Sequence, residues 1–136
     1  SCNIPFGLLF VDIDNFKDVN DTHGHEVGDR VLAMVAKTLG NALRAGDSLH
    51  RWGGEEFLAF VRNVNKATFQ AIAERLRLLV EGSFLTLPEG PLRVTVSVGG
   101  TLAQQTDTLD SLAERADALM YRAKSAGRNC ATLDCL

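Results

Sequence analysis

The chain has 136 residues, 46% of them hydrophobic and 23% charged, and 14 basic against 17 acidic side chains leave a net charge of −3. These values predict one soluble globular domain with an apolar core and no need for disulfides. The slight acidity argues against binding to nucleic-acid polymers, because proteins that do so are usually strongly basic. The longest apolar run, Phe6 to Val11, is far shorter than the roughly 20 residues that cross a bilayer, so we expect no membrane-spanning segment.

The cysteines favour a cytoplasmic, reducing setting, because Cys2, Cys130 and Cys135 form an odd set rather than a disulfide framework. A metal site at Cys130 and Cys135 would need further ligands, and the tail offers only Asp134. We therefore expect a structural or incidental role for these thiols. The first five residues lack the pattern of a signal peptide.

The first third of the chain predicts a strand and a long helix. An apolar run from Pro5 to Val11 is typical of a buried strand, and Asp12-Ile13-Asp14-Asn15 ends it with turn-forming, acidic residues. Apolar side chains then recur every four residues from Val27 to Leu43. That period predicts an amphipathic helix over about 26–43.

The middle of the chain predicts a hairpin followed by a helix and a strand. The segments Ser48–Arg51 and Glu56–Arg62 flank Trp52-Gly53-Gly54-Glu55, a two-glycine turn of the kind that hairpins prefer. A second helix is predicted over about 67–81. A strand with one apolar face follows from Leu92 to Val98, and we expect the next two glycines to end it.

The last third predicts a third helix, from Leu109 to near Gly127, and a weak strand from Cys130 to Leu133. The resulting order is β-α-β-β-α-β-α-β. It predicts a single domain of two packed layers, with helices against a mixed or antiparallel sheet.

Two pairs of acids fall at the ends of predicted strands. Asp12 and Asp14 follow the first strand, and Glu55 and Glu56 lie at the hairpin tip. Hard oxygen ligands suit Mg²⁺, which takes few protein carboxylates and keeps positions for water and phosphate oxygens. Solvated loop acids explain the same spacing, because Asp is common in turns.

Basic residues near these acids suggest a phosphate site. Main-chain N–H groups and the lysine of Asn15-Phe16-Lys17 could hold a polyphosphate. Lys124 and Arg128 lie four residues apart at the end of the last helix and could reach the same anion. Their alternative role is to complement the dipole of that helix.

Asn20, His25 and Asp29 lie in the polar stretch before and within the first long helix. An ionised Asp only accepts hydrogen bonds, so it complements the adjacent N–H donors of guanine and not adenine. His25 alone is equally typical of a surface or capping histidine.

Four motifs together resemble the GGDEF family of diguanylate cyclases, in the GGEEF variant. They occur in the family's order and spacing over nearly the whole chain, which Gly-Gly-Glu-Glu-Phe alone would not establish. The motifs are Asp12-Ile13-Asp14-Asn15-Phe16-Lys17, His25-Glu26-Val27-Gly28-Asp29, Arg51-Trp52-Gly53-Gly54-Glu55-Glu56-Phe57 and Tyr121-Arg122-Ala123-Lys124-Ser125-Ala126-Gly127-Arg128-Asn129.

The resemblance implies an α+β fold, a ferredoxin-like central β-sheet flanked by helices, related to class III nucleotidyl cyclases. It also implies that two GTP molecules are condensed into cyclic di-GMP with release of two pyrophosphates. The implied cofactor is Mg²⁺, or Mn²⁺ in its place. Each domain would hold one GTP, so the active form would be a homodimer.

By matched position, the resemblance also implies a role for each motif residue. Glu55 would be the proton acceptor, and Glu56 would orient the catalytic groups. The implied sets are Asp12, the Ile13 carbonyl and Glu55 for the metal; Glu55 and Glu56 for catalysis; Phe16, Lys17, Lys124 and Arg128 for the phosphates; Asn20 and Asp29 for guanine, with His25 at a family substrate position; and Arg44 and Asp47 for product inhibition.

Two of these assignments carry further expectations. Relatives that accept ATP resemble a subgroup with Ser at the position of Asp29, so Asp29 favours strict use of GTP. Arg44-Ala45-Gly46-Asp47 matches the family's Arg-x-x-Asp inhibitory site, where Arg can bind the guanine O6 and N7 acceptors. The alternative is an arginine at a helix end and an aspartate in a turn.

In the family, a helical segment with an Asp-x-Leu-Thr-x-Leu-x-Asn-Arg motif precedes the first strand, whereas this chain starts five residues before Phe6. We therefore expect residues 1–136 to be a GGDEF domain that lacks this segment. It would belong to a larger signalling protein, with or without a membrane anchor. A competing function is an inactive GGDEF domain that only binds GTP or cyclic di-GMP. The active cyclase is favoured by the intact motif residues Asp12, Lys17, Glu55, Glu56 and Lys124.

Overall fold

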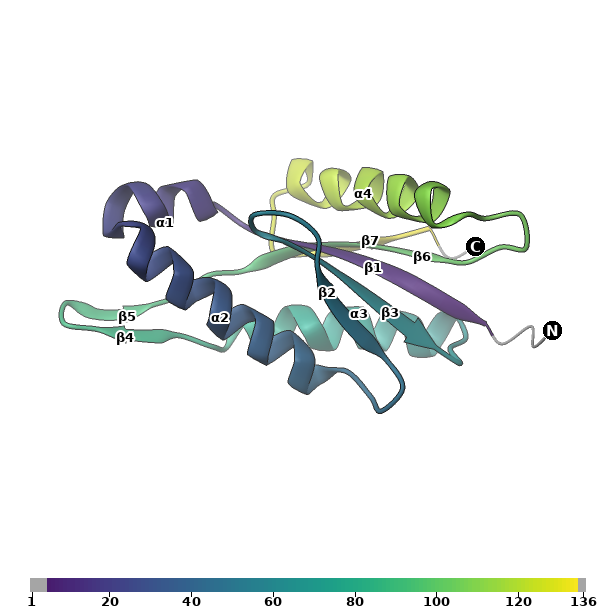
Figure 1. The fold of residues 1–136 in the computed structure, drawn as a ribbon, viewed down its shortest axis with the longest axis horizontal. Helices are drawn as coiled ribbons and strands as arrows, with labels where there is room; N and C mark the ends of the chain where they lie inside the picture. Colours follow the sequence, from purple (N-terminus) through teal and green to yellow (C-terminus); the bar gives the residue numbers. More distant parts are fainter. Residues whose placement is uncertain (1–4, 135–136) are drawn as a thin grey trace.

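A computed structural model describes residues 5–134 and contains a five-stranded sheet in the order β2-β3-β1-β6-β7 (Figure 1). The pair β6–β7 is parallel, and the other three pairs are antiparallel. A separate two-stranded hairpin extends from one end of the molecule. The sheet strands are β1 (Phe6–Ile13), β2 (Ser48–Arg51), β3 (Glu56–Arg62), β6 (Val96–Leu102) and β7 (Ala131–Leu133), and the hairpin strands are β4 (Leu85–Leu87) and β5 (Gly90–Leu92).

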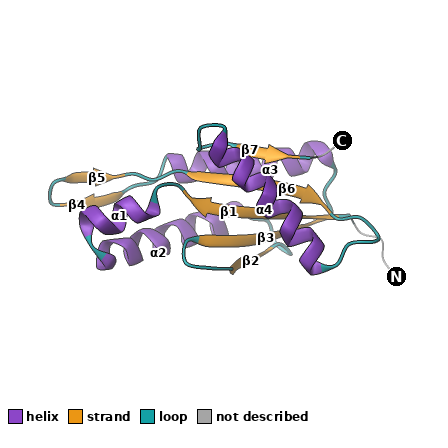
Figure 2. Ribbon diagram, turned by 90° about the horizontal axis from the view of Figure 1, so that it is seen from above, coloured by secondary structure: helices purple, strands orange, loops and turns teal. Residues whose placement is uncertain are grey.

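Residues 5–134 contain four helices, of which three cover the two faces of the sheet while the first packs on the second at one end of the molecule (Figures 1 and 2). The second and third pack against each other on one face, and the fourth packs on the opposite face over β1 and β6. The helices are α1 (Phe16–His23), α2 (His25–Ala42), α3 (Lys66–Glu81) and α4 (Leu109–Ser125). The predicted α+β class with a sheet flanked by helices is confirmed, but the expected two-layer packing is wrong.

The third layer follows from the composition of β1. Leu9 and Val11 join the apolar cluster beneath α2 and α3, whereas Leu8 and Phe10 join a second cluster beneath α4. A strand buried on both faces reads as a continuous apolar run rather than an alternating one. The continuous apolar run of β1 that predicts a strand therefore also indicates that both faces of this strand are buried.

Glycine at position 99 permits the close approach of α4 to the sheet. A Cβ atom there would collide with the main chain of Ala116 and Met120. Gly99 and Gly100 lie within β6, which continues to Leu102. The expectation that these glycines end the strand is wrong. Leu92, predicted to begin that strand, belongs to the separate hairpin.

The main element missing from the sequence prediction is α1. Only two of its side chains, Phe16 and Val19, are buried, so it lacks the long apolar period that predicts a helix. In addition, β1 runs two residues past Val11, so Asp12 lies within the strand. In the sheet, β2 and β3 begin and end at the predicted residues.

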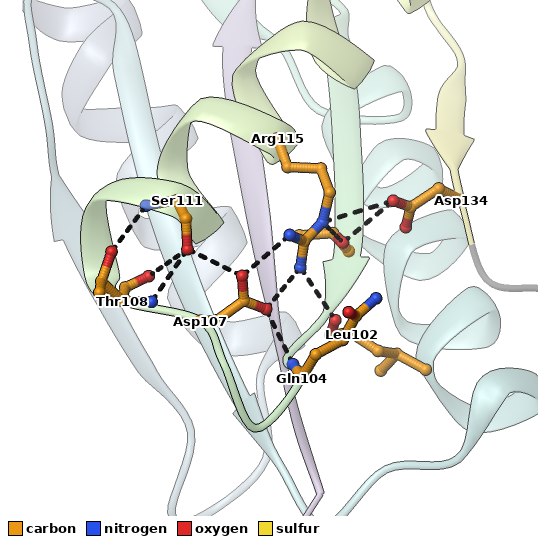
Figure 3. A network of polar contacts seen from close by, with 8 residues as sticks. Leu102, Gln104, Asp107, Thr108, Ser111, Arg115 and Asp134 are labelled. Carbon is orange, nitrogen blue, oxygen red and sulfur yellow. Dashed lines mark hydrogen bonds and ion pairs between the residues drawn. The ribbon is translucent and has the colours of Figure 1, made fainter.

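At the far end of the sheet, a polar network joins α4 to β6 and to the segment after β7 (Figure 3). The Arg115 guanidinium donates to both carboxylate oxygens of Asp107, at 2.9 and 2.7 Å, and to the hydroxyl of Thr101 at 2.7 Å. It also pairs with Asp134 at 3.5 Å. The hydrogen bonds from Arg115 hold the pKa of Asp107 well below its usual range. This network braces the end of the sheet away from the carboxyl end of β1.

No helix in residues 5–134 is long and apolar enough to cross a membrane. Of the cysteines, Cys130 donates its thiol hydrogen to the carbonyl oxygen of Ala123 at 3.3 Å, which agrees with a structural role. Cys2 and Cys135 lie outside the described residues, so the expectation that Cys130 and Cys135 have a structural or incidental role and bind no metal stays a prediction.

Candidate functional site

The carboxyl end of β1 meets the turn between β2 and β3 (Figure 1). The antiparallel register places Asp12 opposite Glu56, and the Ile13 N–H donates to the Glu55 carbonyl oxygen at 3.1 Å. The two pairs of acids that the sequence places at strand ends are therefore brought to one edge of the sheet.

An arginine that the sequence analysis gave no role holds the hairpin turn in shape. Arg51 donates from Nε to the Gly53 carbonyl at 3.1 Å and from Nη2 to the Gly54 carbonyl at 2.6 Å. The Trp52 N–H donates to the Glu56 carbonyl at 2.8 Å and closes the turn. Arg51 precedes the two glycines, but its contacts are with main-chain atoms, which leave no residue pattern to recognise.

The two aspartates at the carboxyl end of β1, Asp12 within the strand and Asp14 just after it, have different surroundings. Asp14 is held entirely by the protein. It is 3% exposed and accepts from the Ser97 hydroxyl at 2.6 Å and the Thr95 hydroxyl at 2.7 Å. The Asn129 N–H adds a bond at 3.0 Å and the Lys124 ammonium one at 3.2 Å. Burial alone would raise the pKa of Asp14, but these donors outweigh it and lower the pKa.

Asp12 lacks such a set of donors. Its carboxylate pairs with the Lys124 ammonium at 2.9 Å. Burial nevertheless raises the pKa of Asp12, and the negative charge of Asp14 adds to the effect while Lys124 opposes it. Burial, followed by the charge of Asp12, also raises the pKa of Glu56. Asp12 and Glu56 therefore hold their protons more strongly than free carboxyl groups do.

The donor atoms at this edge fit a divalent cation that binds oxygen. Within the described part of the chain, no three His, Cys, Asp or Glu side chains lie close enough to bind a metal by themselves. The Asp12 and Glu55 carboxylates and the Ile13 carbonyl are hard oxygen donors on one hollow. Mg²⁺ commonly uses such a small protein set, with water and phosphate oxygens completing its shell. Asp14, which the spacing alone also offered as a ligand, uses both oxygens within the protein.

Two adjoining hollows gather the predicted metal and substrate residues. The first, of about 270 Å³, and the second, of about 350 Å³, share Phe16, Lys17 and Glu55. The first is also lined by Asp12, Ile13, Lys124 and Arg128, and the second by Asn20, His25 and Asp29. Glu56 lines neither hollow. It lies on β3, opposite Asp12 of β1.

The second hollow depends on the close packing of α1 against α2. A Cβ atom at Gly28 would collide with the side-chain oxygen of Asn20, so glycine leaves the space that this amide occupies. Phe16 and Val19 fasten the other side of α1 to the core. Asn20 is thereby brought to the same hollow as Asp29 on α2.

The predicted inhibitory residues lie apart from these hollows. Arg44 lines a separate cavity of about 440 Å³ with Arg62 and Asn63, and this cavity shares no lining residue with the other two. The Asp47 side chain is 1% exposed and accepts from the main-chain N–H groups of Arg44 at 2.9 Å and Arg62 at 3.1 Å. Asp47 thus holds the loop in shape, and Arg44 is the group that faces solvent.

Comparisons with known proteins agree with the fold and the motifs. The family described as "Diguanylate cyclase, GGDEF domain" matches residues 2–130. The response regulator PleD of Caulobacter vibrioides is 44% identical over 128 residues, which are 92% of this chain. This chain spans 28% of the length of PleD.

Solved structures give the same result. The diguanylate cyclase SiaD from Pseudomonas aeruginosa, solved with its activator SiaC, has a TM-score of 0.91 and 37% identity over 95% of this chain and 50% of its own. The GGDEF domain of DgcB from Caulobacter crescentus, solved in complex with c-di-GMP, has a TM-score of 0.89 and 32% identity over 96% of this chain and 78% of its own.

Replacing the lysine that bridges the two aspartates tests the charge balance of the site. In the absence of divalent ions, we expect Lys124→Met to lower the free energy of unfolding by about 2–4 kcal/mol, because it leaves two buried carboxylates without their cation. Mg²⁺ should then stabilise the variant more than it stabilises the unsubstituted protein, since an ion that binds only the folded state adds to its stability.

Urea unfolding with and without Mg²⁺ measures both effects. Lys37→Met, at an exposed position of α2, is the matched control and should leave the stability and the Mg²⁺ effect nearly unchanged. Equal Mg²⁺ stabilisation of Lys124→Met and the unsubstituted protein would show that Lys124 does not balance a cation site.

Proposed function

The chain belongs to the GGDEF family of diguanylate cyclases, and on that premise we propose that it condenses two GTP molecules into cyclic di-GMP, with release of two pyrophosphates. The observation that carries this proposal is the contact between two hollows. The first is lined by acidic and basic side chains, and the second by an amide and a carboxylate side chain. The first suits a metal-bound triphosphate and the second a guanine base. The neighbouring DgcB structure, which contains c-di-GMP, supports the same chemistry.

The base is selected in the second hollow. Guanine presents adjacent N–H donors on its Watson–Crick edge, and an ionised Asp29 only accepts hydrogen bonds. Asn20 can both donate and accept, so it complements the remaining polar edge of the base. Adenine offers a different pattern of donors and acceptors there, and Asp29 would face an acceptor in place of a donor.

The triphosphate is held in the first hollow by Lys17, Lys124 and Arg128, with Phe16 beside it. Asp12, the Ile13 carbonyl and Glu55 would hold Mg²⁺. Bound there, such a cation polarises phosphate oxygens and lowers the pKa of a coordinated hydroxyl.

The remaining roles fall to side chains of the protein. Glu55 accepts the proton of the attacking 3′-hydroxyl, because Glu55 lines the hollow and Glu56 does not. Glu56 restrains the Asp12 carboxylate from the neighbouring strand. Lys124 compensates the charge of Asp12 before substrate binds and that of the phosphates afterwards.

Two copies of the domain are required, because each presents one guanine hollow and one phosphate hollow. We propose a homodimer in which the clefts face each other, so that each 3′-hydroxyl lies against the α-phosphate of the opposite GTP. Holding the two nucleotides in this way converts a bimolecular attack into a positioned one.

Activity is tested by incubating the protein, joined to an N-terminal dimerising helix, with GTP and Mg²⁺ and detecting the product by mass spectrometry. Cyclic di-GMP and two pyrophosphates per product are expected. Glu55→Gln should lower the rate by at least about 100-fold, the usual contribution of a positioned general base, while GTP still binds.

Glu114→Gln, an exposed carboxylate on α4, is the matched control and should keep the full rate. If the unsubstituted protein binds GTP but forms no cyclic product, the competing function of a nucleotide-binding receptor would hold instead.

Base selection is tested by Asp29→Ser. Removing the acceptor-only carboxylate should relax the preference for GTP over ATP by about tenfold, because one discriminating hydrogen-bonded contact of roughly 1–3 kcal/mol is lost. Parallel titrations with the two nucleotides measure the ratio of affinities. An unchanged ratio would remove Asp29 from the guanine site.

We propose product feedback at the cavity lined by Arg44, where the guanidinium can bind guanine O6 and N7 together. Arg44→Ala should weaken binding of cyclic di-GMP by at least about tenfold and abolish inhibition of GTP turnover. Isothermal titration with the cyclic dinucleotide measures the first effect. Cyclic di-GMP that binds Arg44→Ala as tightly as the unsubstituted protein would contradict the assignment.

A further inference from the structure

The turn after α4 carries a cluster of polar contacts outside the two hollows. We call it the Asn129 cluster, and it consists of Asp14, Arg77, Glu81 and Asn129. It joins the end of β1, helix α3 and the turn that leads from α4 into β7.

The main chain of this turn is left-handed over three consecutive residues. Gly127 has φ 119°, Arg128 φ 67° and Asn129 φ 46°. Glycine adopts such angles freely and asparagine does so more readily than most residues, but Arg128 loses roughly 1–2 kcal/mol there. Contacts from outside the turn, next to Arg128, offset this cost.

Asn129 makes those contacts with all of its polar groups. Its main-chain N–H donates to Asp14 Oδ2 at 3.0 Å, and its side-chain Nδ2 donates to Glu81 Oε2 at 2.5 Å. The Arg77 Nη1 group donates to Asn129 Oδ1 at 3.1 Å and to its main-chain oxygen at 3.4 Å. Arg77 is itself held on α3 by an ion pair with Glu74.

Asn129 is linked to both basic residues from the end of α4 that line the phosphate hollow, to Arg128 as its chain neighbour and to Lys124 through Asp14. Arg128 lines that hollow. Asp14, which accepts from the Asn129 N–H, also accepts from the Lys124 ammonium at 3.2 Å. The position of the Asn129 main chain therefore sets the directions from which Arg128 and Lys124 approach.

We propose that Asn129 is a positioning residue, which through Arg77, Glu81 and Asp14 fixes Arg128 and Lys124 for binding of the GTP triphosphate. This inference rests on the proposed function. Because its side chain is turned toward α3, Asn129 acts through its neighbours and does not touch the nucleotide. Its loss should weaken triphosphate binding while leaving the guanine hollow unchanged.

Asn129→Gly separates the side-chain tether from the backbone conformation. Glycine accepts the positive φ without cost and keeps the main-chain N–H that donates to Asp14 and the main-chain oxygen near Arg77, but it lacks the side-chain bonds to Arg77 and Glu81. We expect the dissociation constant for GTP with Mg²⁺ to rise about tenfold, the size typical of losing a group that orients a binding residue. The affinity for guanosine, measured by competition, should stay the same.

Arg77→Met should give the same pattern, although position 77 lines neither hollow. Arg115→Met is the matched control, because it removes a comparable arginine network at the opposite end of the sheet (Figure 3). Its stability should fall while its affinity for GTP stays within about twofold of the unsubstituted protein, since no contact leads from it to the phosphate hollow.

The inference is overturned if Asn129→Gly and Arg77→Met bind GTP as tightly as the unsubstituted protein. It is also overturned if Arg115→Met weakens GTP by the same factor, because the effect would then be general loosening. An unsubstituted protein that binds GTP without forming product contradicts the proposed cyclase and leaves the binding comparison valid. No GTP binding at all contradicts both.

Discussion

Burial of two carboxylates at the end of a central strand is the constraint on which the site depends. Ionised carboxylates are costly to bury unless donors or cations compensate them. The protein compensates Asp14 internally, with hydroxyls of Thr95 and Ser97 beside the end of β1, a main-chain N–H and Lys124. Asp12 pairs with the same lysine, but burial still raises the pKa of Asp12. The end of β1 thus carries one carboxylate that the protein itself holds and one that the proposed function assigns to a metal ion.

The charge distribution explains how a mildly acidic domain can take a polyanionic substrate. Residues 12–56 hold nine acids and five bases, whereas the remainder of the chain holds eight acids and nine bases. The acidic excess lies in the segment that supplies Asp12, Glu55 and Asp29. Lys124 and Arg128 come from the basic remainder and face this segment across the hollow. In the proposed function, a divalent cation that arrives with the triphosphate would complete the neutralisation.

Much of this arrangement could be predicted from the sequence, because regular periods and motifs mark it. Apolar spacing and turn residues predicted the strands β2 and β3 and the helices α2 to α4. They also placed the two acid pairs at strand ends, which the fold then brings together. Helix α1 could not be predicted, since two buried side chains make no period. The partners of Asp14 were also missed, because Thr95 and Ser97 lie more than 80 positions away and hydroxyls in a strand carry no distinctive pattern. The same holds for Arg77 and Asn129, which are 52 positions apart.

The central claim is that this acidic edge binds a nucleoside triphosphate only together with its cation. Calorimetric titration of the protein with GTP, in Mg²⁺ and in EDTA, tests it most directly. The dissociation constant should be at least about tenfold lower with Mg²⁺, a difference of about 1.4 kcal/mol, because without the ion the phosphates meet the Asp12 and Glu55 carboxylates. Equal affinity in EDTA would show that the lysines and arginine alone hold the phosphates and that the carboxylates do not serve a metal.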